Sequence, residues 1–275
     1  MLTIFVLASA RSGTTYLSGL FKKNVKNCIS RHEPYLDPFN HALFGKPIYF
    51  NAVENDEKLR PYLAKKKKRI ESFKTSAYFE GSHAFLKSAN RLAVDYFPNM
   101  KLIHLVRNPL KVAKSISNRE ILVNKYRIPL RYYRADDGNS YFRWSLTGKE
   151  PIYKNFDLNK LTPFQYYVIE WVEIENRAMH LLDKFTMHER CFTIQVGEEL
   201  NSKMVLKEMM HFLGLQTYND DIVMDCRKNV NPKTVTNVTK QDEKEFQEVI
   251  AQLPENYLEI FKKSECYRKL GVFNK

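Results

Sequence analysis

An apolar run near the start of this sequence ends in a loop crowded with groups that bind anions. Residues 2–8, LTIFVLA, are typical of a buried strand, and a helical pattern follows from residue 14. A loop between a strand and a helix N-terminus offers backbone N–H donors and the positive end of the helix dipole to an anion. Gly13 lets the backbone approach a phosphate closely. The side chains that add donors are those of Arg11, Ser12, Thr14 and Thr15.

This loop lacks the lysine of a nucleotide triphosphatase. The signature of those enzymes is G-x-x-x-x-G-K-[ST]. In the same frame this chain has Ala8 in place of the first glycine and Thr14 in place of the lysine. A magnesium-dependent NTPase or kinase is therefore disfavoured. Arg11 is the single cation inside the loop, and we expect it to hold a 5′-phosphate and a group beyond it.

A second anion site is predicted where another apolar strand ends. Arg107 stands at the end of the strand-like run 101–109, and Ser115 lies about two turns into the helix that follows Pro109. Ligands of α/β sheets bind at strand ends, where an arginine fork and a hydroxyl can clamp a phosphate. Two phosphate sites on adjacent strands predict a nucleotide that is phosphorylated at both ends.

The elements that must position these residues alternate between strand and helix. Such alternation favours an α/β fold with a mostly parallel central sheet and right-handed crossovers. Strands are expected within 2–8, 77–87, 101–109 and 191–200, and a short strand followed by a loop is expected within 27–45. Helices are expected at 14–23, 55–76, 88–98, 110–120, 162–185 and 202–215, with a final helix at 242–253. We expect one domain, 1–275, in which the aromatic- and arginine-rich stretch 121–163 is an acceptor-side insertion or lid.

Composition limits the class of protein. Lys and Arg number 44 against 31 Asp and Glu, a formal net charge of +13 that favours anionic partners. No apolar run is long enough for a secretory or transmembrane segment, and the four cysteines form no C-x-x-C pair for zinc. We expect a cytoplasmic protein, or a catalytic domain without its anchor, and no metal. The KKKKR run, Lys65 to Arg69, is interpreted as the solvated face of a helix.

The two loops together resemble those of sulfotransferases that use 3′-phosphoadenosine 5′-phosphosulfate (PAPS). That family binds the 5′-phosphosulfate with [K/R]-S-G-T-[ST], which is Arg11–Thr15 here. It binds the 3′-phosphate with R-[ND]-P and a serine eight residues after the arginine, which correspond to Arg107 and Ser115. Residues 193–215 are similar to a later strand and helix of the family. The resemblance implies a three-layer, P-loop NTPase-like fold, PAPS as the donor, and a hydroxyl of a glycan, glycolipid or small alcohol as the acceptor.

Two segments offer a general base for the acceptor hydroxyl. RHEPYLDP, 31–38, places His32 and Glu33 at a strand end, where the carbohydrate-type branch of the family keeps a glutamate base. FEGSHAFLK, 79–87, places His83 at the next strand end, which resembles the histidine base of the cytosolic branch. We favour Glu33 over His83, since the loop Arg-Ser-Gly-Thr-Thr-Tyr is closer to the prokaryotic or carbohydrate-type branch. The other residue would then bind the acceptor or tune the base.

Further expectations follow from the resemblance and from its competitors. The family often places cations in the segment that matches 226–240, so Arg227, Lys228 and Lys233 are candidates to close over the nucleotide. A metabolite kinase is the first competing hypothesis, and it predicts dependence on magnesium and ATP. A nucleic-acid binder that uses Lys65 to Arg69 is the second, and it predicts salt-sensitive binding. It leaves the two phosphate sites unexplained, so no nucleic-acid partner is expected.

Overall fold

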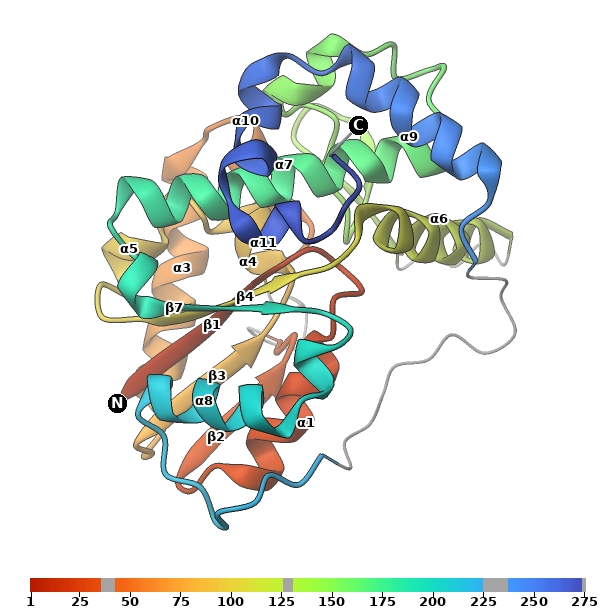
Figure 1. Ribbon diagram of the computed structural model, residues 1–275. Helices are drawn as coiled ribbons and strands as arrows, with labels where there is room; N and C mark the ends of the chain where they lie inside the picture. The colour runs from red at the N-terminus through yellow and green to blue at the C-terminus, as the bar shows by residue number, and fades with distance from the viewer. Residues whose placement is uncertain (36–42, 126–130, 225–236, 274–275) are drawn as a thin grey trace.

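The computed structural model describes residues 1–35, 43–125, 131–224 and 237–273. A parallel sheet of five strands lies at its centre, in the order β2-β3-β1-β4-β7 (Figure 1). The strands are β1 Leu2–Ala8, β2 Cys28–His32, β3 Ala77–Gly81, β4 Lys101–Val106 and β7 Cys191–Gln195. The predicted α/β class and its parallel sheet are confirmed. Because β1 is flanked by β3 on one side and β4 on the other, the chain order reverses there, and this is where α/β sheets bind ligands.

Alternating side chains of β1 enter two separate hydrophobic cores. Ile4 and Val6 are fully buried against α1 (Thr14–Asn24) and α8 (Lys203–Leu213). Phe5 and Leu7 point to the other face, where they join the larger core. The sheet therefore lies between two helical layers, as the alternation of a strand buried on both faces requires.

The larger core is built by the helices on the second face of the sheet (Figure 1). They include α2 (Lys46–Ala52), α3 (Asp56–Glu71), α4 (Ala84–Ser88), α5 (Ala93–Tyr96), α6 (Pro109–Lys125) and α7 (Pro163–Lys184). The C-terminal helices that add to this layer are α9 (Lys240–Gln252), α10 (Glu255–Lys263) and α11 (Glu265–Arg268). The expectation that 242–253 is the final helix is therefore wrong. Phe261 of α10 and Tyr267 of α11 stack or pack edge-on against Trp171 of α7.

The helix predicted at 88–98 is also wrong, because the chain forms α4, a turn and then the short α5. The carbonyl of Lys87 accepts hydrogen bonds from Asn51 Nδ2 at 3.0 Å and from Arg177 Nη1 at 3.0 Å. Arg177 Nη1 also donates to the carbonyl of Leu86. Side chains have thus taken the carbonyls that a continuing helix would pair with the N–H groups four residues on.

One lysine of the KKKKR run contradicts the solvated-face interpretation. Lys66 is 2 % exposed and lies on the inner face of α3 with Leu63 and Ile70, at helical spacing. Its Nζ contacts both carboxylate oxygens of Glu80, at 2.6 and 2.5 Å, and Tyr78 donates to the same carboxylate. The partner lies on β3, so sequence periodicity alone does not reveal it.

The stretch 121–163 holds the end of α6 and then an antiparallel hairpin of β5 (Tyr132–Arg134) and β6 (Ser140–Phe142). A short 3₁₀ helix, Pro151–Asn155, leads to α7. Two further 3₁₀ turns, His188–Arg190 and Glu199–Asn201, flank β7. Within the described parts of the chain, no helix is both long and apolar enough to cross a bilayer.

Candidate active site

A cleft of about 860 Å³ opens where the five parallel strands end at their carboxyl termini. Nearly all of the predicted site residues line it. They are Arg11, Gly13, Thr14, Thr15, Glu33, His83, Arg107 and Ser115. Ser12 is the exception, because it is fully buried and its hydroxyl is hydrogen-bonded to that of Ser9 at 2.9 Å. Asn237 and Val238 also line the cleft, whereas Arg227, Lys228 and Lys233 lie outside the described residues.

The first loop has the backbone of an anion site. Gly13 is the N-cap of α1 with φ +95°, and Arg11 is also left-handed, with φ +64°. A Cβ at Gly13 would lie 2.8 Å from Leu200 Cδ2, so a side chain there would have both backbone strain and a clash. The first turn of α1 carries no acidic residue. Its N–H groups and positive dipole therefore face the cleft without a local carboxylate.

The two predicted phosphate loops are tied together. Arg11 Nε donates to Ser115 Oγ at 3.1 Å, and the guanidinium of Arg107 donates to the backbone carbonyl of Arg11. Residues that are about a hundred positions apart thus share one wall of the cleft. This contact follows from the pairing of β1 with β4, in which Ala8 lies opposite Leu105.

The cleft is strongly cationic. Among the described residues that line it, four carry positive charge and one carries a carboxylate: Arg11, Arg107, Lys111, Arg119 and Glu33. Burial lowers the pKa of Arg11, and the nearby Arg119 and Arg107 lower it further. Burial also lowers the pKa of Arg107. Guanidiniums whose charge is disfavoured in this way gain most when an anion enters.

Lys111 and Arg119 were not predicted as site residues. They lie one turn before and one turn after Ser115 on α6, at i−4 and i+4, so the three side chains share one helix face. The same spacing in the sequence is the signal that could have found them. Arg119 also lies over the ring of Trp144, 5.5 Å from its centroid, and Arg131 lies 4.4 Å from the same ring.

The two candidate bases meet at the opposite wall. Glu33 Oε1 lies 3.3 Å from His83 Nε2 and 3.8 Å from His32 Nε2. They meet because β2 and β3 are parallel neighbours in which His32 lies opposite Gly81. Glu33 follows at once in a left-handed conformation, φ +45°. Burial raises the pKa of Glu33, and the charges of His32 and Arg119 oppose part of that rise.

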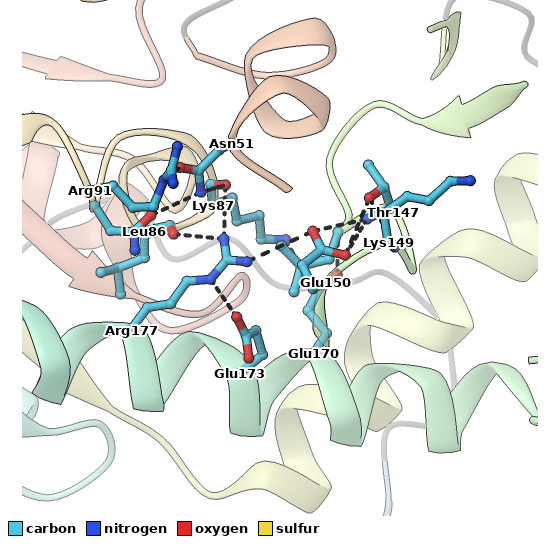
Figure 2. A network of polar contacts seen from close by, with 12 residues as sticks. Asn51, Leu86, Lys87, Arg91, Thr147, Lys149, Glu150, Glu170, Glu173 and Arg177 are labelled. Carbon is cyan, nitrogen blue, oxygen red and sulfur yellow. Dashed lines mark hydrogen bonds and ion pairs between the residues drawn. The ribbon is translucent and has the colours of Figure 1, made fainter. Parts of the chain in front are cut away.

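Lys87, at the end of the segment 79–87, does not line the cleft, and neither does Arg177 of α7. Figure 2 shows Lys87 and Arg177 in a buried polar network above α7. Lys87 Nζ lies 2.5 Å from Glu170 Oε1 and donates to the carbonyl of Trp144. Arg177 Nε donates to Glu173 at 2.7 Å, and its guanidinium also approaches Glu150. These residues tie α4 and the segment 144–150 to α7.

His104 is a core residue. It is 1 % exposed, and its Nε2 lies 2.9 Å from Glu175 Oε2, which also accepts from Tyr267. It does not line the cleft.

Comparison with known proteins assigns this fold and cleft to a class. The family model for the sulfotransferase domain matches residues 3–162, more than half of the chain. The chain therefore belongs to the sulfotransferase family, and both phosphate loops lie inside the matched region. No curated protein sequence matches the chain.

Solved structures resemble the chain along nearly its whole length. A sulfotransferase from Alicyclobacillus acidocaldarius is 16% identical, with 94% of this chain and 96% of that one covered and a TM-score of 0.50. The sulfotransferase domain from the curacin biosynthetic pathway is 14% identical, with 90% and 96% covered and a TM-score of 0.49. The domain from the Synechococcus PCC 7002 olefin synthase is 12% identical, with 91% and 94% covered and a TM-score of 0.48. At these identities the first likeness supports the P-loop NTPase-like fold alone.

Proposed function

We propose that this sulfotransferase moves the sulfuryl group of PAPS to a hydroxyl of a glycan, glycolipid or small alcohol. The observation that carries the proposal is the contact between the two phosphate loops in one cationic cleft, with Arg11 bonded to Ser115 and Arg107 bonded to Arg11. A cleft of about 860 Å³ is large enough for a nucleotide and part of an acceptor. In this proposal Arg107 and Ser115 hold the 3′-phosphate, and the 11–15 loop holds the 5′-phosphosulfate.

The chemistry is an in-line displacement at sulfur. The acceptor oxygen forms a bond to sulfur as the bond from sulfur to the bridging phosphate oxygen breaks, and 3′-phosphoadenosine 5′-phosphate leaves. Arg11 stabilises the charge that grows on the bridging oxygen, with help from Thr14 and the N–H groups of α1. Glu33 accepts the proton of the acceptor hydroxyl. Its raised pKa makes it a stronger base than an exposed glutamate.

His83 has a supporting role in this proposal. At 3.3 Å from Glu33 Oε1 it is close enough to orient the carboxylate or to pass its proton onward. If Glu33 were not the base, His83 would be the next group within reach. The hairpin residues Tyr132 and Tyr141 line a second hollow of about 270 Å³, and such rings can pack against a sugar or lipid acceptor.

Calorimetric titration with 3′-phosphoadenosine 5′-phosphate tests the donor assignment. AMP and magnesium-ATP serve as comparison ligands. We expect micromolar binding of the bisphosphate, much weaker binding of AMP because it leaves Arg107 without a phosphate, and no gain from magnesium. Preference for magnesium-ATP, or no nucleotide binding, would overturn the assignment and favour the kinase or nucleic-acid hypotheses.

A further inference from the structure

His32 connects the phosphate loop to the candidate base. Its Nδ1 lies 2.8 Å from the carbonyl oxygen of Gly81, and its Nε2 lies 2.9 Å from Thr15 Oγ1. A carbonyl oxygen only accepts hydrogen bonds, so Nδ1 must carry a proton. The second nitrogen therefore decides both the charge of the ring and the direction of the bond to Thr15.

The two states of His32 leave Thr15 with different properties. When the imidazole is neutral, Nε2 is an acceptor and takes the only proton of the Thr15 hydroxyl. That hydroxyl then has only lone pairs to offer to a phosphate. When the imidazole is charged, Nε2–H donates to Thr15 Oγ1 and the hydroxyl proton is released for a bond to an anion. A donor bound at the 11–15 loop thus fits the charged state better.

The surroundings of His32 support the same coupling. Glu33 favours the charged ring from 3.8 Å. Glu80 on β3 also lies near Glu33, but its charge is compensated by Lys66. The cationic groups around Glu33, the neighbour of His32, are Arg11 in the loop, Arg119 on α6, Lys87 on α4 and, when protonated, His83. An anion bound between Arg11 and Arg119 offsets their charge, which lowers the cost of a third cation beside them.

We propose that His32 is a positioning residue that takes up a proton when the donor's 5′-phosphosulfate binds, turning the Thr15 hydroxyl toward the donor and holding Glu33 ionised. The proton comes from solvent and stays on the ring, while Glu33 remains the acceptor of the substrate's proton. The inference rests on the proposed donor site. It makes the base ready for reaction only after the donor is in place.

Proton uptake on binding of 3′-phosphoadenosine 5′-phosphate tests this coupling. Calorimetric titrations are run at one pH in two buffers of different ionisation enthalpy, and the heat difference counts protons. The phosphates of the ligand release protons when they bind cations, so the informative quantity is the wild type minus His32→Gln. We expect the wild type to take up as much as about one more proton per nucleotide than the variant.

The affinity must follow the same linkage. If donor binding takes up a proton at His32, Kd of the wild type rises with pH relative to Kd of His32→Gln, by up to about tenfold per pH unit. Thr15→Val is expected to abolish the extra uptake, because no hydroxyl remains to be turned, whereas Thr15→Ser retains it. His188→Gln is the matched control, since His188 is exposed and pairs with Asp183, and it should behave as the wild type.

The outcomes distinguish a failure of the proposed role of His32 from a failure of the proposed donor site. Equal proton uptake by the wild type, His32→Gln and Thr15→Val, with the nucleotide still bound, would overturn the role of His32 and leave the donor site intact. Absence of nucleotide binding in the wild type would instead overturn the proposed function. A structural role of His32 alone would weaken binding in His32→Gln by the same factor at every pH, and that result would also overturn the proposal.

Discussion

Two glutamates, Glu33 and Glu170, each pair with a nitrogen-bearing side chain near α4, and the two pairs differ in exposure and in hydrogen bonding. Glu33 and His83 face the cleft, with the contacting atoms 3.3 Å apart and side chains 20% and 9% exposed. Lys87 lies one helical turn beyond His83 on α4, and its Nζ is 2.5 Å from Glu170 Oε1 on α7; these two side chains are 0% and 3% exposed. The second pair is embedded in the polar network of Figure 2, with the Trp144 carbonyl as a further acceptor for Lys87.

The difference shows what separates a reacting group from a structural one of the same type. Lys87 and Glu170 each have a second hydrogen bond besides the one they share: Lys87 donates to the Trp144 carbonyl, and Glu170 accepts from the Leu146 N–H at 2.8 Å. A buried pair whose polar atoms are hydrogen-bonded in this way stabilises the fold, and neither residue lines the cleft. Glu33 is desolvated with weaker compensation, and its pKa is raised. Partial burial beside an open cleft is the condition under which a carboxylate becomes a useful base.

The largest expected effect is on stability, at the structural pair. Lys87→Met leaves Glu170 buried without its cation, and we expect a loss of about 3–5 kcal/mol in the free energy of unfolding. Urea unfolding measures it. The double variant Lys87→Met with Glu170→Leu should recover much of this loss. Unchanged stability in Lys87→Met would mean that the pair of Lys87 and Glu170 contributes little to the free energy of unfolding. The structural role that separates it from Glu33 and His83 would then be wrong.

At the pair of Glu33 and His83, substitution should reduce turnover rather than stability. Glu33→Gln keeps the shape of the side chain but cannot accept a proton. Turnover should therefore fall on the order of 100-fold or more. The measurement is release of 3′-phosphoadenosine 5′-phosphate from PAPS with an acceptor found by screening alcohols and sugars. Nucleotide affinity measured by calorimetry is the control and should stay within a factor of a few. Full turnover in this variant would transfer the role of base to His83.

The donor wall of the cleft is expected to depend on Arg107. Arg107→Ala removes a charge-assisted clamp and should weaken binding of 3′-phosphoadenosine 5′-phosphate by roughly 1.5–3 kcal/mol. AMP, which lacks the 3′-phosphate, should lose much less. Arg190→Ala is the matched control, because Arg190 is exposed and donates to the Pro98 carbonyl, away from the cleft. Equal affinity of Arg107→Ala and the wild type for the bisphosphate would remove Arg107 from the 3′-phosphate site.

The parts of the site that the sequence predicted are those whose chemistry is local. The 11–15 loop follows one strand and opens one helix, so its donors, its left-handed glycine and its dipole are all written in consecutive residues. Arg107 and Ser115 are likewise carried by one strand and its helix. Bringing the two loops together also requires β1 and β4 to be neighbours, and the pairing in the structure supplies that contact.

The parts that were missed depend on contacts between distant residues. The burial of Lys66 depends on Glu80, which lies on β3 across a loop from α3. The break in the helix expected at 88–98 depends on Asn51 and Arg177, from two other helices. The exact partner of Glu33 depends on the register of β2 against β3. Periodicity predicts which face of an element is buried, but not which polar group of another element will pair with it.

The smallest expected effect is a change in the free energy of unfolding of Glu33→Gln. It has the opposite sign to the change expected for Lys87→Met, so it distinguishes the two pairs directly. Since the pKa of Glu33 in the folded protein lies above its ordinary value of 4.5, folding favours the protonated form. The corresponding stability is fully present below the unfolded-state pKa and is lost as pH rises through the folded-state pKa. Glutamine does not titrate, so Glu33→Gln should gain stability relative to the wild type between about pH 4 and pH 8.

Urea unfolding of both proteins at these two pH values measures the difference. Lys87→Met should lose stability at pH 8, where Glu33→Gln gains it. A Glu33→Gln variant that is destabilised equally at both pH values would place Glu33 with Glu170 as a structural carboxylate. A gain at neutral pH together with a loss of turnover would instead mean that the fold tolerates an unfavourable charge at the position where the reaction requires one.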